Sequence, residues 1–387
     1  VKNWKRTVLD QVVFLHEKHG WIFKNSQKKI SFGLVRVANI KHAISLAKYL
    51  SAEMGHAQIA CYHANDWLIS RFHKEQRLDF LLTRHKGGTK RPTGNEHIFV
   101  DDEILDIIKS SISKDIPFIV IATPVEEVGR DHDFDWAVID ASSVQSIVQT
   151  AGRVNRHRLN IVDEPNIVIP QFNYKYCENK DRAQPKKQAV FNRPGYEGYV
   201  NANKQYKTQD LSDLLPWTEL NELVIDARLR FNADLCDFAK YDDVQIKKFN
   251  QDFFASDGDQ LFSHSQADAA LMTEQIYKDT CLRDVQKQEV YSFDVQDDEL
   301  KIYHYENNVM ELNIKTGRYE PSIKQVVFNC ENAPTNAWLN LDPAGLKDLC
   351  EEKGLDIEEG CKISLAVYGD DIPKWNYDFG FGVYATK

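Results

Sequence analysis

The chain has 387 residues, 27% of them charged, and carries a formal net charge of −10 with a sequence pI of about 5.7. A chain of this length predicts about two or three domains with sizeable cores. The acidic balance excludes a uniformly basic nucleic-acid sleeve, so phosphate contacts require a local groove.

Residues 1–21 predict an amphipathic helix whose apolar positions are interrupted by charges, unlike a signal peptide. No apolar run approaches the ~18 residues that cross a bilayer, so we expect no membrane contact and a cytoplasmic location. The seven cysteines are scattered singly, which predicts free thiols rather than a disulfide framework or a zinc ribbon.

Up to about residue 170, apolar runs of strand length alternate with helical patterns. The runs, rich in Val and Ile, cover residues 30–38, 58–63, 118–123, 136–140 and 166–170, and the helical patterns cover 41–54, 66–84 and 101–112. This alternation predicts α/β structure with a parallel sheet buried on both faces. Ligands of such sheets bind at the carboxyl ends of the strands.

The pattern changes after this region. Residues 171–205 lose periodicity, residues 207–283 are mostly helical in pattern, and the segment from 289 alternates in the strand period apart from one helix that ends at Gly354. We therefore predict a parallel-sheet lobe over 1–175, a linker and helical segment over 176–285, and a small β-rich α+β domain over 286–387.

Two motifs carry the chemistry. The first is Thr123-x5-Gly129-x-Asp131, at the end of an apolar run. The second is Gln149-x2-Gly-Arg153-x2-Arg156; on one continuous helix its amide and two guanidinium groups would share an exposed face, opposite an apolar stripe. Such a face suits a polyphosphate, and Gly152 allows a close approach.

The order of these motifs resembles motifs V and VI of superfamily 2 nucleic-acid helicases, which lie in the second of two RecA-like lobes. The fuller wording of residues 123–140 and 149–158 resembles the CRISPR-associated helicase-nuclease of type I systems, in particular subtype I-F. The resemblance rests on residues 30–170. Pro124 and Arg130 stand where many relatives have Gln and Leu, so they take no role from it.

The resemblance implies a nucleotide site. Arg153 and Arg156 would be arginine fingers that reach the γ-phosphate of ATP, with Gln149 beside them. Asp131 would lie near the ribose and the fingers, with Gly129 as the turn before it. A loop or capping carboxylate is the structural alternative for Asp131.

The resemblance also implies a surface for single-stranded DNA. Thr123 would contact a phosphate of the tracking strand, and Asn39 and His63 are weaker nucleic-acid-facing positions. Each has a structural alternative: a turn threonine, a helix N-cap for Asn39, and a surface histidine with satisfied hydrogen bonds for His63.

Several motifs are missing from the sequence. There is no G-x4-G-K-[ST] phosphate loop, and in IFVDDE at 98–103 an aspartate is far better explained as a helix N-cap than as a metal ligand. His132-Asp133 alone does not make an HD metal cage, so we predict no metal site. ATP with Mg would be shared with a missing first lobe, and nuclease metals would belong to a missing HD domain. We expect a C-terminal fragment, inactive alone.

The partners that the resemblance implies are single-stranded DNA and a Cascade-type surveillance complex, with the CRISPR adaptation integrase and phage anti-CRISPR inhibitors as further candidates. Two alternatives stay open. The chain could be the second lobe of a restriction or repair translocase, or a non-catalytic module that binds DNA or protein.

Overall fold

The computed structural model describes residues 1–85, 94–127, 129–158, 161–181, 189–192, 205–215, 240, 244, 247, 287–296, 299–313, 318–367 and 372–386. They fall into two compact units. One consists of Val1, Ala141–Gln149 and Pro170–Val285, and the other of Lys2–Asp140, Thr150–Ile169 and Gln286–Lys387.

The second of these units contains a six-stranded sheet. Its order is β3 (Gln58–Tyr62), β4 (Asp115–Ala122), β2 (Lys29–Arg36), β5 (Trp136–Ile139) and β6 (Ile167–Val168), all parallel, with β1 (Trp21–Ile22) antiparallel to β2. Seven of the eight residues of β4 are buried, as expected for a strand covered on both faces. The predicted parallel α/β lobe is confirmed.

Gly33 of β2 explains how the large side chain of Trp136 is accommodated in the sheet. A Cβ at Gly33 would lie 2.1 Å from the ring of Trp136 on the neighbouring strand. The indole therefore lies across the bare backbone of Gly33, and its Nε1 donates to Oγ of Ser31 at 2.9 Å. Only glycine leaves room for this ring.

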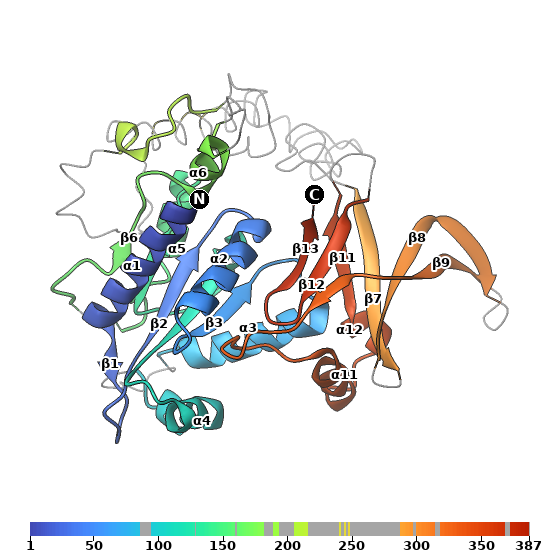
Figure 1. Ribbon diagram of the computed structural model, residues 1–387, viewed down its shortest axis with the longest axis horizontal. Coiled ribbons are helices and arrows are strands. Elements are labelled where there is room, and N and C mark those ends of the chain that lie inside the picture. The colour runs from blue at the N-terminus through green and yellow to red at the C-terminus, as the bar shows by residue number, and fades with distance from the viewer. Residues whose placement is uncertain are drawn as a thin grey trace, which may run out of the picture. The chain divides into compact units, whose positions relative to one another are not determined.

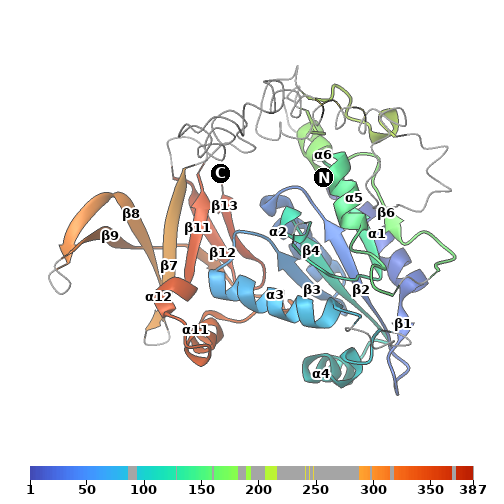
Figure 2. The ribbon, with the colours of Figure 1, turned by 180° about the vertical axis from the view of Figure 1, so that it is seen from behind.

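Helices cover both faces of the sheet. Contacts with the sheet place α1 (Lys2–His19) and α2 (Ile40–Glu53) on one face, and Figures 1 and 2 show α3 (Leu68–Leu82) on the other. The predicted cap of α4 (Asp102–Ser110) is confirmed: the Asp101 carboxylate accepts a hydrogen bond from the backbone N–H of Ile104 at 3.1 Å.

The C-terminal third forms two further sheets in the same unit. One is antiparallel, in the order β11 (Lys362–Ala366), β7 (Gln288–Gln296), β8 (Glu299–Asn313) and β9 (Arg318–Val326). The other has the order β10 (Asn329–Glu331), β12 (Lys374–Asp378) and β13 (Gly382–Thr386). Two helices, α11 (Pro343–Glu352) and α12 (Ile357–Gly360), contact β7 of the antiparallel sheet (Figure 1). The predicted β-rich module is confirmed. Its predicted helix is α11, which ends at Glu352 rather than at Gly354, and α12 is a second helix that the sequence pattern did not predict.

This β-rich part shares a core and a sheet edge with the lobe. Trp67 packs edge-on against Phe293 and Tyr377, with ring centroids 4.9 and 5.5 Å away. The backbone N–H of Ile59 on the edge strand β3 donates to the carbonyl oxygen of Asn336, and the N–H of Trp338 donates to Ile59. Packing and backbone pairing thus join segments that are distant in the sequence.

The first unit is described in shorter pieces. They include α6 (Tyr174–Lys180) and a 3-10 turn at Leu211–Asp213, while α5 (Val144–Ala151) crosses the division between the units. Most of the predicted linker and helical segment, 176–285, lies outside the described residues, and the domain boundaries at 175 and 285 remain predictions. No helix among the described residues is long and apolar enough to cross a membrane.

Candidate functional site

Three predicted site residues follow the carboxyl ends of adjacent parallel strands. Asn39 comes after β2, His63 after β3 and Thr123 after β4. This is the edge of an α/β sheet where ligands bind. The loops that begin here carry the first motif.

The loop after β4 starts with a 3-10 turn, η2 (Pro124–Glu126). Arg36, at the end of β2, holds this turn through a 2.6 Å ion pair between its Nε and Oε1 of Glu127, both nearly buried. Gly129 then adopts φ +72°, a left-handed conformation that strains any other residue. The turn that precedes Asp131 therefore needs glycine for its backbone.

The second motif does not form one continuous helix, which corrects the sequence prediction. Helix α5 ends at Ala151, and the chain then turns, with Asn155 at φ +50°. The cause is backbone pairing: Phe134 donates to Arg153, Asn155 donates to Phe134, and Phe134 forms a parallel bridge with Val154. Two hydrogen bonds to the segment before β5 thus replace another turn of helix.

Arg153 is buried, which corrects the expectation that both arginines lie on an exposed face. It is 6% exposed. Its Nε donates to the carbonyl oxygen of Glu126 at 3.3 Å and its Nη2 to that of Glu127 at 2.9 Å. The first arginine of the second motif therefore holds the turn of the first motif.

Arg156 and Asp131 form the exposed pair of the site. Nε of Arg156 donates to Oδ1 of Asp131 at 2.6 Å, and the two side chains are 41% and 55% exposed. Nη1 of Arg156 donates to the carbonyl oxygen of Gly152 at 3.1 Å. Within the part of the chain that the structure describes, Nη2 of Arg156 has no hydrogen-bond partner. One amino group of this guanidinium therefore remains available for an anion.

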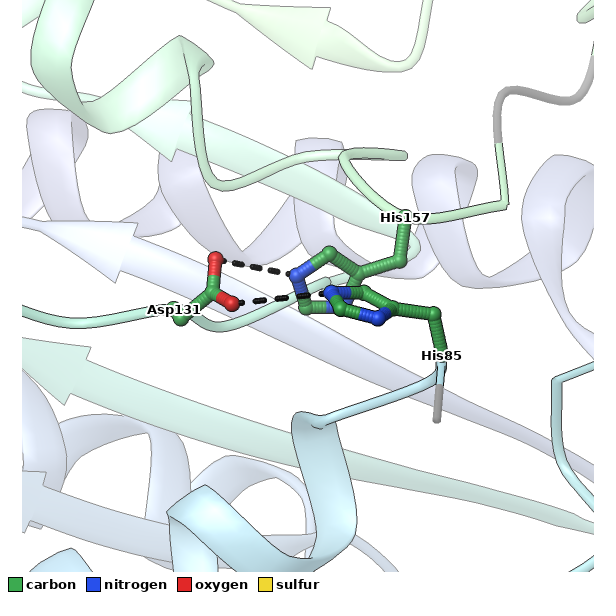
Figure 3. Close-up of side chains that lie close together, drawn as sticks. All are labelled: His85, Asp131 and His157. Atoms are coloured by element: carbon green, nitrogen blue, oxygen red, sulfur yellow. Dashed lines mark hydrogen bonds and ion pairs between the residues drawn. The ribbon is translucent and has the colours of Figure 1, made fainter. Parts of the chain in front are cut away.

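Two histidine rings face the Asp131 carboxylate (Figure 3). Nε2 of His157 lies 3.0 Å from Oδ1 of Asp131, and Nε2 of His85 lies 3.6 Å from Oδ2. The hydrogen bond from His157 lowers the pKa of Asp131 to about 2; slight burial opposes this shift, and the hydrogen bond from Arg156 adds to it. Asp131 is thus an anion at neutral pH.

His85, Asp131 and His157 are also close enough for a metal ion, with ligand atoms within 4.8 Å of one another. Hydrogen bonding argues against this use. Nδ1 of His157 accepts from the backbone N–H of Arg84 at 3.2 Å, so the neutral ring carries its proton on Nε2 and donates it to Asp131. No lone pair remains at Nε2 for a metal, and the geometry favours hydrogen bonding over metal binding.

A buried charge network lies beneath this pair, and the sequence reasoning missed it. Asp133 and Asp135 are almost fully buried, and Arg158 binds both, with Nη2 2.9 Å from Asp133 and Nη1 2.6 Å from Asp135. Arg84 adds a 2.6 Å bond to Asp135. Burial alone would raise the pKa of Asp135, but the two arginines hold it at about 2. Alternating aspartates at 131, 133 and 135 were the available signal.

His132 belongs to a second buried cluster. Its Nδ1 lies 2.6 Å from Glu126, and its Nε2 lies 2.8 Å from Asp79 on α3. Burial alone would lower the pKa of His132, but the two carboxylates outweigh it and raise the pKa to about 9. The two residues of the His-Asp dipeptide therefore belong to two structural clusters, His132 with Glu126 and Asp79, and Asp133 with Arg158.

The residues predicted to face nucleic acid differ in exposure. Asn39 is exposed at the start of α2. Thr123 is only 4% exposed, and its N–H donates to the carbonyl oxygen of Tyr62. His63 is fully buried, with Nε2 2.7 Å from the carbonyl oxygen of Phe381, so the expectation that it faces a bound strand is not met. Gln149 is exposed on α5.

The comparisons with known proteins agree with this arrangement of motifs. The family described as "CRISPR-associated nuclease/helicase Cas3, C-terminal" matches residues 29–159, which include every predicted site residue. Residues 29–159 are thus similar to the C-terminal part of Cas3. Both motifs, the Arg156–Asp131 pair and the aspartates beneath it lie inside the matched residues.

Two curated Cas3 proteins of subtype I-F/YPEST are similar to this chain. The protein of Pseudomonas aeruginosa is 35% identical over 192 residues, which cover 49% of this chain and 16% of that protein. That of Pectobacterium atrosepticum is 34% identical over 222 residues, covering 56% and 18%. The matched region thus spans less than a fifth of either Cas3 relative.

Solved structures give a partial likeness. The likeness to a crystal structure of T. fusca Cas3 with ADP extends over 73% of this chain and 25% of the Cas3 chain. The sequence identity is 15% and the TM-score is 0.34. The likeness to a crystal structure of a CRISPR-associated protein extends over 93% of this chain and 34% of that protein's chain. The sequence identity is 13% and the TM-score is 0.36.

Proposed function

We propose that this chain supplies the second RecA-like lobe of an ATP-dependent single-strand DNA translocase that carries a nuclease and degrades invader DNA in type I CRISPR interference. The Cas3 family relationship supports this assignment. Single-stranded DNA and a surveillance complex are the proposed partners of the whole protein. The adaptation integrase and anti-CRISPR inhibitors are further candidates.

The observation that supports the proposal most directly is the contact between Arg156 and Asp131. It joins the two motifs, leaves the Arg156 side chain 41% exposed and orients its guanidinium through one short hydrogen bond. An oriented arginine with an available amino group suits a polyphosphate. We therefore assign Arg156 as the arginine finger and Asp131 as the residue that orients it.

The site fits the role of a second lobe rather than that of a complete ATPase. Phosphate-loop NTPases use that loop, a metal ion and a cation near the γ-phosphate, and an arginine in the last position is worth roughly 10³ to 10⁵ in rate. This chain offers the cation, while ATP and Mg would be held mainly by a first lobe. Gln149 and Gly152 are proposed to lie beside the nucleotide, and Gly129 to shape the loop.

Arg153 takes a positioning role in this proposal. Both described hydrogen bonds of its side chain go to backbone carbonyl oxygens of the first motif. It would keep the loop of Asp131 in place, while Arg156 contacts the anion. Thr123 and Asn39, at the ends of adjacent strands, are the proposed DNA contacts.

The test is ATP hydrolysis stimulated by single-stranded DNA, measured for this chain alone and after mixing with a first lobe that carries a phosphate loop. We expect background turnover for the chain alone and robust turnover for the mixture. Arg156→Ala should abolish that turnover, Arg156→Lys should restore it only in part because an ammonium lacks the two-pronged donor geometry, and Arg6→Ala on the exposed side of α1 should leave it unchanged.

A mixture in which Arg156→Ala hydrolyses ATP as fast as the unchanged chain would remove the finger assignment and favour a non-catalytic module. Binding of single-stranded DNA to the chain alone should be weak and should fall steeply with salt, because few phosphate contacts are available. Tight binding that persists in high salt would instead reveal a separate DNA site.

A further inference from the structure

The turn that carries Arg156 is held by the carboxylate of Asp133. The proposed function gives this residue no contact with ATP or DNA. Asp133 is fully buried. Its Oδ1 accepts from the backbone N–H of Arg156 at 3.1 Å, and its Oδ2 accepts from the backbone N–H groups of His157 and Arg158, each at 3.2 Å. Three consecutive N–H groups thus converge on one carboxylate.

Such convergence needs a particular backbone. Successive N–H groups form an anion-binding concavity when a left-handed residue adjoins right-handed ones. Asn155, directly before the three donors, has φ +50°. The three N–H groups therefore form an anion-binding nest, and the anion bound there is the carboxylate of Asp133.

The nest is closed on its other sides as well. The Arg158 side chain donates to Asp133 from Nε and Nη2, both at 2.9 Å. The N–H of Asp133 donates to the carbonyl oxygen of Leu82 at the end of α3, and the pairing of Phe134 with Asn155 fixes the approach to the turn. The carboxylate has no freedom to move away from the three N–H groups.

The consequence lies at Arg156 and His157. Both residues donate to Asp131 through their side chains while their backbone N–H groups are held by Asp133. We propose that Asp133 is a positioning residue that preforms the turn and so aims the Arg156 guanidinium. The catalytic effect of Asp133 rests on the proposed function. Its structural role does not, since that role can be tested without ATP.

The structural test uses amide hydrogen exchange in the full 387-residue chain. Asp133→Asn keeps the shape but replaces one acceptor oxygen by a donor that faces N–H groups. Exchange at Arg156, His157 and Arg158 should rise by roughly tenfold or more relative to the amides of β5. Asp135→Asn is the matched control, because Asp135 is also buried and binds the Arg158 side chain, but the backbone N–H that it accepts belongs to Phe32 and not to the turn.

A second pair of variants leaves every buried charge in place and keeps the test decisive if Asp133→Asn fails to fold. Asn155→Gly accepts a left-handed backbone, while Asn155→Val resists it. Valine should raise exchange at the three turn amides, and glycine should leave it close to that of the unchanged chain. Equal exchange in both variants, or a turn no more affected by Asp133→Asn than by Asp135→Asn, would overturn the proposal.

The catalytic consequence is tested in the complete enzyme by a double-mutant cycle. Asp133→Asn should lower kcat for DNA-stimulated ATP hydrolysis about tenfold or more while the KM for ATP changes less than about twofold. Combined with Arg156→Ala it should add little further loss, because both changes remove one interaction. Fully additive losses would overturn the positioning role. If Arg156→Ala itself has no effect, the proposed function fails, while the exchange result still decides the role of Asp133.

Discussion

Nη2 of Arg153 donates to the backbone carbonyl oxygen of Glu127 across 2.9 Å, so a side chain from the Gly-Arg-x-x-Arg motif holds the turn after β4. Two sets of hydrogen bonds therefore connect the motifs. Those of Arg153 are buried or partly buried, and that between Arg156 and Asp131 is exposed. These two links differ in burial, and mutations should separate them.

We expect Arg153→Ala to lower the free energy of unfolding by about 1.5–3 kcal/mol, because it leaves one buried and one partly buried carbonyl oxygen without a charged donor. Arg156→Ala removes an exposed pair and should cost less than about 1 kcal/mol. Urea denaturation of the two variants measures this difference. Equal losses would show that burial does not distinguish the two arginines.

Gly33→Ala should lower the free energy of unfolding by on the order of 1–3 kcal/mol, because the new Cβ would meet the Trp136 ring. Gly55→Ala is the matched control, since no atom lies within 4 Å of a Cβ built there. Thermal denaturation should show a clear fall in Tm for the first variant and almost none for the second. A stable Gly33→Ala protein would mean that the indole can move aside.

The N-cap of α4, Asp101, can be tested by comparing its replacement with that of the neighbouring Asp102. Asp101→Ala should cost about 1–2 kcal/mol, because it removes the acceptor for the Ile104 N–H as well as a partner of Arg77. Asp102→Ala should cost less than about 0.5 kcal/mol, since Asp102 is exposed. Asp101→Asn keeps the capping oxygen and should fall between them. A larger loss in Asp102→Ala would refute the capping assignment.

Stability should depend on pH through His132. Its pKa is about 9 in the folded chain against 6.5 as the ordinary value, so its contribution is fully present below pH 6.5 and is lost as pH rises through about 9. His132→Gln should flatten the stability profile over this range. Denaturation midpoints between pH 6 and about 9.5 provide the measurement.

His63 provides a control of opposite sign. Burial lowers its pKa to about 4, so its contribution is present above pH 6.5 and is lost as pH falls through about 4. His63→Gln should therefore alter the acid side of the profile and leave the alkaline side unchanged. If stability still falls with rising pH in His132→Gln, a group other than His132 causes that fall.

Local patterns were enough to predict the lobe. The strands at Lys29–Arg36 and Asp115–Ala122 are mostly apolar, which is typical of a parallel sheet covered on both faces, and Asp101 stands directly before a helical period. These features depend on neighbouring residues. The sequence therefore contains all the information that their prediction needs.

The errors concern contacts between distant segments. Helical spacing placed Arg153 and Arg156 on one face, but pairing of Phe134 with Val154 ends the helix first. His63 was predicted to face nucleic acid, yet Phe381 from the far end of the chain accepts its hydrogen bond. Neither partner is visible in a sequence window, because tertiary pairing overrides local periodicity.

The backbone bonds that Ile59 forms with Asn336 and Trp338 have a consequence for handling the protein. β3 is the outermost strand of its sheet, and its exposed N–H and C=O groups would otherwise be a template for pairing between molecules. A segment from the C-terminal third covers that edge. Versions shortened before residue 336 should therefore aggregate through β3, even though every strand of the parallel sheet remains intact.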